Sequence, residues 1–235
     1  MKSIYSLLLL SLHLFFKKTG NLLNLLVLPL MGGFLGFIFK SIPENEAVSS
    51  LWFLSLILGL GLIFFASSLV GEAMVIEERR NGTLEYILAS GFSARELWLG
   101  KAVAMTGIVI TITLLGWATM VTVYVWGHGM LPLIPTAIGV KLGLLIIGIL
   151  ILVFNLSLIV VGLGLVVRRT SVATGLANLL FIVIVFAGPW LLSHLNYIWL
   201  TPEKLLGLAI LMFAAGNTCL ARFITEERVI LVIGD

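Results

Sequence analysis

Residues 72–101 read EAMVIEERRNGTLEYILASGFSARELWLGK, and this stretch decides how the chain is organised. It holds nine charged side chains, out of 14 basic and 11 acidic in the whole sequence. The residues before and after it are almost entirely apolar. Charged side chains are costly inside a lipid bilayer, so the pattern predicts a water-exposed connection between two segments that lie in a membrane.

Within this connection, turn and helix signals alternate. Asn81-Gly82 is a dipeptide typical of turns. From Thr83 to Ser90 the chain reads as a short helix, because Leu84, Ile87 and Leu88 would share one face. The following Gly91 suits the residue after a helix, where a left-handed backbone is needed.

A second helix start follows at once. Ser93 and Glu96 have the spacing of a capping box, in which hydroxyl and carboxylate satisfy reciprocal backbone N–H groups. Phe92 and Leu97 occupy the positions of a hydrophobic staple. The next helix is therefore predicted to begin near Ala94, and the connection is expected to be a built structure.

The rest of the chain predicts an all-α membrane protein. Of 235 residues, 60% are hydrophobic and 11% are charged, against about a quarter charged in soluble domains. Runs long enough to cross a bilayer number six, at Leu22–Phe39, Leu51–Val70, Trp98–Trp126, Ile134–Val167, Val172–Leu192 and Leu205–Phe223. With the N-terminus inside, eleven Lys and Arg residues fall on the cytoplasmic side and three outside. That bias predicts that both termini are cytoplasmic.

The first 18 residues form a separate apolar stretch that ends in Lys17-Lys18. It is too short to span a bilayer and lacks the small residues of a signal-peptide cleavage site. We expect an uncleaved amphipathic helix in the cytoplasmic membrane interface, with its basic end among lipid headgroups.

The charged connection is better suited to a protein partner than to lipid. The positive-inside rule requires only Lys and Arg, whereas this stretch also holds five glutamates. Mixed charges on a short, rigid helix favour docking of another protein over a plain interfacial loop.

The run from Glu77 to Ala89, followed by Gly100-Lys101, resembles the pattern of ABC-2-type transporter permeases. The predicted layout is also similar: an interfacial helix, six spans and a charged segment between the second and third. The resemblance implies one transmembrane domain over 1–235, with the interfacial helix at 1–18 and a cytoplasmic coupling segment at 72–98. Many members carry proline where this chain has Gly91-Phe92.

In that family the coupling segment docks on a separate ATPase subunit. The resemblance assigns this docking to Glu77, Glu78, Arg79, Gly82, Thr83, Leu84, Glu85, Leu88 and Ala89. It implies export of a hydrophobic or amphiphilic substrate (lipid, peptide or drug-like) across the inner membrane, with ATP and Mg²⁺ on the partner. A second permease copy, or a homologous permease, is implied as well. The haem-exporter permease of cytochrome c maturation is a similar alternative.

Other classes are less well supported by the sequence. No zinc-binding motif, intramembrane carboxylate pair or catalytic triad is evident, and Gly100-Lys101 lacks the remaining residues of a phosphate loop. We therefore expect no enzyme activity, cofactor or metal in this chain, and no nucleic-acid partner. A channel or structural membrane subunit is a second alternative, although it leaves the charged connection without a purpose.

Four polar residues lie inside predicted spans and are candidates for a translocation path: Asn155, Ser157, Asn178 and Asn217. Buried polar groups in lipid require hydrogen-bond partners. Hydrogen bonding between helices is the alternative, and the one that this chemistry favours.

Overall fold

A computed structural model of the chain describes residues 4–17, 69–128, 136–167 and 202–225. It also describes short pieces at 20, 26–27, 29–30, 32–34, 36–37, 67 and 229. These residues form helices and no other regular structure. The elements are α1 (Ile4–Lys17), the π-helix η1 (Glu72–Ile76), α4 (Glu77–Arg80), α5 (Thr83–Ala89), α6 (Ala94–His128), α7 (Thr136–Val166) and α10 (Pro202–Phe223).

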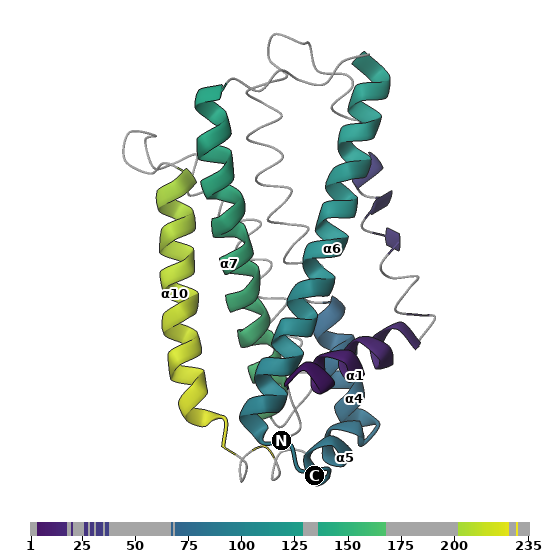
Figure 1. The fold of residues 1–235 in the computed structure, drawn as a ribbon, viewed down its shortest axis with the longest axis vertical. Coiled ribbons are helices and arrows are strands. Elements are labelled where there is room, and N and C mark those ends of the chain that lie inside the picture. Colours follow the sequence, from purple (N-terminus) through teal and green to yellow (C-terminus); the bar gives the residue numbers. More distant parts are fainter. Residues whose placement is uncertain are drawn as a thin grey trace.

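Three long helices lie side by side, with α7 packed against both α6 and α10 (Figure 1). α6 runs in one direction, and α7 and α10 run in the other. Glycines allow close approach. A Cβ atom added at Gly162 would collide with Leu220 of α10, and one at Gly36 would lie 2.7 Å from the backbone oxygen of Met120. Gly32 and Gly36 both lie against α6.

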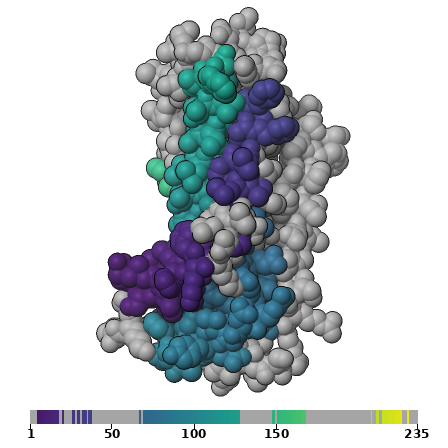
Figure 2. Space-filling view, turned by 90° about the vertical axis from the view of Figure 1, so that its right-hand side faces the viewer, coloured from purple at the N-terminus to yellow at the C-terminus, as the bar shows by residue number. Residues whose placement is uncertain are grey.

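The N-terminal helix α1 crosses α6 near the start of α6 and lies beside residues 72–98, which keep the name coupling segment from the family resemblance (Figures 1 and 2). Its Leu7 and Phe15 are buried, eight residues apart and so on one face. Gly100 lets α1 approach α6, because a Cβ there would lie 3.1 Å from that of Leu7. The outward side carries Tyr5 and Phe16, which are exposed.

One buried cluster joins the N-terminal helix, the coupling segment and the first turns of α6 to the C-terminal half of α7. Its largest fully buried apolar members are Leu7, Met74, Leu84, Ile87, Leu97, Met105, Leu156 and Leu165. The coupling segment is thus fixed in the core at one end of the molecule, beside the ends of the long helices (Figure 1).

The structure corrects the predicted number of membrane-spanning helices. Among the described residues, one helix is long and apolar enough to cross a membrane, over Ala94–Gly127. The prediction of six spans is therefore wrong for this part of the chain. The prediction was made from apolar runs in the sequence alone, whereas a span also requires about 20 apolar residues within one helix. The other apolar helical stretches among the described residues, Tyr5–Lys17 and Leu150–Val166, have 10–17 residues, and the second is part of α7.

Several of the predicted spans lie outside the residues that the structure describes. The run 172–192 is wholly outside them, and nearly all of 51–70 is as well. Only short pieces of 22–39 are described. The described fold is therefore the packing of α6, α7 and α10 with α1 and the coupling segment.

Candidate functional site

The coupling segment begins with a π-helix. In η1 the N–H of Glu77 donates to the carbonyl of Glu72, five residues back, whereas the N–H of Asn81 donates to the carbonyl of Glu77, four residues back. The hydrogen-bond ladder therefore changes register at the junction of η1 and α4. π-Helices are rare and are frequent at functional sites.

The two turns and the helix start are confirmed as predicted. Gly82 and Gly91 both adopt positive φ, at 69° and 92°, and they bracket α5. The Ser93 N–H donates to the Glu96 carboxylate at 2.9 Å, and the Glu96 N–H donates to Ser93 Oγ at 3.2 Å. α6 begins at Ala94, directly after Ser93, so the capping box spans the first turn of the helix.

Gly82 offers a clean test of this turn. We expect Gly82→Ala to lower the free energy of unfolding by about 1 kcal/mol, because an L-residue in the left-handed region is strained. The expected loss does not come from a steric clash, since no atom lies within 4 Å of a Cβ atom added at Gly82. Gly107→Ala is the matched control: it is also open, but it lies within α6. Thermal unfolding of the detergent-solubilised chain should show loss for Gly82→Ala and slight gain, if any, for Gly107→Ala. Equal shifts would contradict the turn geometry.

The two faces of α5 have different environments. Leu84 is 0% exposed and Ile87 is 2% exposed, so the apolar face predicted from the sequence is turned into the chain's own core. The opposite face presents Glu85, Tyr86 and Ala89. We call these three residues the docking face. Tyr86 is 78% exposed, which is unusual for a large aromatic side chain on a short, rigid helix.

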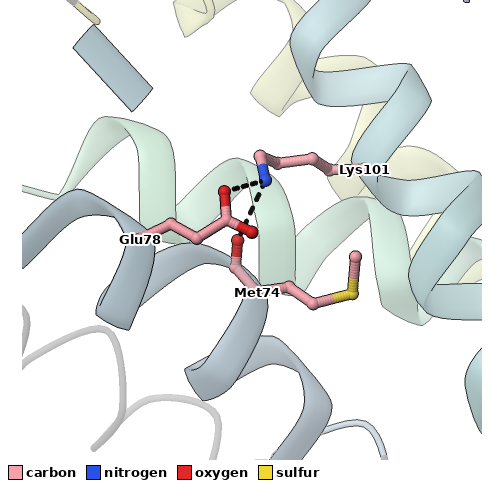
Figure 3. Close-up of polar contacts among 3 residues, drawn as sticks. All are labelled: Met74, Glu78 and Lys101. Atoms are coloured by element: carbon pink, nitrogen blue, oxygen red, sulfur yellow. Dashed lines mark hydrogen bonds and ion pairs between the residues drawn. The ribbon is translucent and has the colours of Figure 1, made fainter. Parts of the chain in front are cut away.

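Glu78 is buried and forms an ion pair inside the chain. Its carboxylate lies 2.5 Å from the Lys101 ammonium, with side-chain exposures of 8% and 0%. Lys101 Nζ also donates to the carbonyl of Met74 at 3.1 Å (Figure 3). One cation on α6 therefore binds both η1 and α4. Burying a charge is costly unless it is paired and hydrogen-bonded, and this arrangement provides both conditions.

Arg79, the next residue, reaches α7 instead. Its Nη1 donates to the carbonyl of Val167 at 2.6 Å. Val167 directly follows the last residue of α7, where carbonyls lack partners within the helix and a cation is favoured. Burial lowers the pKa of the Arg79 guanidinium, but from so high a value that the group stays charged.

The remaining predicted docking residues are only partly accessible. Glu77, Thr83 and Leu88 are half-buried. The predicted set is thus divided: Glu85 and Ala89 face outward, while Glu78 and Leu84 lie in the interior.

Two of the four candidate path residues are brought together by α7 and α10. Asn217 Nδ2 donates to the backbone carbonyl of Asn155 at 3.0 Å and to its side-chain oxygen at 2.9 Å. This is the hydrogen bonding between helices that was the alternative to substrate contact. Ser157 is buried, and Asn178 lies outside the described residues. A translocation path through these residues stays a prediction.

The sequence interpretation did not identify Lys101 as the ion-pair partner of Glu78 or Tyr86 as an exposed aromatic residue on α5. A signal for Lys101 was present, since a cation at the start of a long apolar helix requires a partner. The signal for Tyr86 was helical periodicity, which places residue 86 opposite the apolar face formed by Leu84 and Ile87. Comparison of the chain with protein-family models, with curated proteins and with solved structures finds no match.

Proposed function

We propose that this chain is the membrane-embedded subunit of an ATP-driven exporter and that its ATPase is a separate polypeptide which binds the docking face. The observation that carries the proposal is Tyr86, exposed on a helix whose other face is held in the core. Exposed tyrosines on rigid elements are typical centres of protein–protein binding. Glu85 beside it favours a protein over the anionic headgroups of lipids.

The proposed location is the cytoplasmic membrane, crossed more than once, with the coupling segment in the cytoplasm. The apolar span in α6 and the antiparallel α7 beside it support this location. The outward apolar side of α1 supports it too, because an interfacial helix would bury that side among lipids. The cargo is a hydrophobic or amphiphilic molecule, ATP and Mg²⁺ bind the partner, and a second permease subunit completes the transporter.

The proposal is tested by purifying the tagged full chain from its host membranes. A polypeptide that carries a phosphate loop should copurify with the chain. The purified complex should hydrolyse ATP in a reaction that requires magnesium and is inhibited by vanadate. Tyr86→Ala should weaken that association by about 2 kcal/mol, as expected for a central interface residue. Tyr5→Ala, at a tyrosine that is 67% exposed on α1, is the control and should retain it. Equal recovery of the ATPase with both variants would refute docking at this face.

A further inference from the structure

Glu78 and Arg79 are neighbours in α4, yet they bind two different long helices. Successive residues of a helix point about 100° apart, so the two side chains leave α4 in different directions. One reaches α6 and the other reaches the end of α7. α5 follows after only Asn81 and Gly82, so α4 links the docking face to both long helices, in addition to the direct connection of α5 to α6 through residues 90–93.

The connection between α4 and α6 is a buried ion pair. Lys101 is fully buried and is held by the Glu78 carboxylate and the Met74 carbonyl together (Figure 3). Charge-assisted hydrogen bonds are strong and are weakly screened when water is excluded. Movement of α4 away from α6 would leave two uncompensated charges in the interior, so the two elements should move together.

The connection to α7 has a polar and an apolar part. Arg79 caps the carbonyl of Val167. Nearby, Val75 of η1 packs so closely on α7 that a Cβ atom at Gly164 would lie 2.5 Å from its Cγ1. A Cβ atom at Gly71 would likewise collide with Val160. The segment just before the docking helix is therefore fitted to the surface of α7.

We propose that Glu78 and Arg79 form a two-sided clamp that carries displacement of α5 to α6 and α7. They are positioning residues inside the chain and not residues that touch the ATPase. The inference rests on the proposed function for the source of the displacement, while the clamp itself is a property of this chain. The clamp lies just after the register change between η1 and α4, and π-helical turns are frequent at functional sites.

The first experiment needs no partner. The full chain in nanodiscs is spin-labelled at Tyr86→Cys on α5 and Ile151→Cys on α7, with the single native cysteine removed as Cys219→Ser. Electron paramagnetic resonance should give a narrow distance distribution. Arg79→Gln should broaden it, whereas Arg80→Gln, at an exposed neighbour, should not. Equal widths in the two variants would overturn the clamp.

The variant Arg79→Lys tests whether the broadening reflects loss of the Arg79 contact or misfolding of the chain. It keeps a cation at the end of α7 but loses the fixed guanidinium geometry, so an intermediate width is expected from a chain of normal thermal stability. A width as narrow as that of Arg80→Gln in a folded Arg79→Lys chain would count against the clamp.

The second experiment uses the complex with the copurified ATPase. The double variant Glu78→Gln/Lys101→Met removes both buried charges together. It should bind as much ATPase as the wild type, while transport coupled to ATP hydrolysis falls by about tenfold. Undiminished coupling would overturn the inference. If no ATPase copurifies with the wild-type chain, the proposed function fails instead, and the distance measurement alone decides the clamp.

Discussion

Replacing Lys101 with methionine should lower the free energy of unfolding by about 3–5 kcal/mol, because it leaves the buried Glu78 carboxylate without a counter-charge. The expectation follows from the geometry, in which the ammonium is fully buried and 2.5 Å from the carboxylate. Methionine has a similar volume, so lost packing contributes little. Thermal unfolding of the detergent-solubilised chain is the measurement, and the midpoint should fall by about 10 °C.

The control for this variant is Arg95→Met, which removes an exposed cation from the same first turns of α6. We expect a change within about 0.5 kcal/mol. Adding Glu78→Gln to Lys101→Met should restore most of the stability, since neutral replacement of both partners of a buried pair is often tolerated. A loss no larger than that of Arg95→Met, or a double variant no better than Lys101→Met alone, would contradict the ion pair.

Trp98→Ala should destabilise the chain by a similar amount, about 3–5 kcal/mol. The indole lies where α6, α7 and α10 meet. Its Nε1–H donates to the carbonyl of Leu158 at 2.8 Å. A Cβ atom at Gly162 would lie 3.2 Å from the same nitrogen and would collide with Leu220. Removing the ring therefore opens a cavity between three helices.

Two further variants separate packing from hydrogen bonding at this junction. Trp98→Phe keeps an aromatic ring but loses the N–H group, so we expect a loss of about 1 kcal/mol. Trp126→Ala removes a tryptophan that is 87% exposed near the other end of α6 and should cost less than about 0.5 kcal/mol. The three variants are ranked by their thermal unfolding midpoints. Equal effects of Trp98→Ala and Trp126→Ala would show that Trp98 does not hold the helices together.

The local structure of the coupling segment was predictable because its signals act over a few residues. The capping box of Ser93 and Glu96 specifies its own hydrogen bonds, and Gly82 and Gly91 mark the positive-φ positions. The apolar face of α5 was also predicted, since it follows from helical periodicity. These features need no knowledge of the rest of the chain.

What covers that face was not predictable from periodicity. Leu84 was expected to meet a partner, but it packs into the chain's own core. Glu78 was expected on the surface, but its partner Lys101 lies 23 residues away in the sequence. Such contacts depend on how α4 and α6 pack, and residues 72–76 hold no local signal for a π-helix. The number of spans was overestimated because apolar content alone does not fix which apolar runs lie within one helix that is long and apolar enough to cross a membrane.

The most direct test of an ATPase bound at the docking face is a cross-link from Tyr86 in native membranes. The full chain with Tyr86→Cys and Cys219→Ser is labelled with a thiol-reactive photo-cross-linker, illuminated, and its adducts are identified by mass spectrometry. Trp126→Cys, at a side chain that is 87% exposed near the opposite end of α6, is the control. We predict that position 86 captures a polypeptide with a phosphate loop and that position 126 does not. Capture of lipid or of another copy of this chain alone from position 86 would contradict the proposed function.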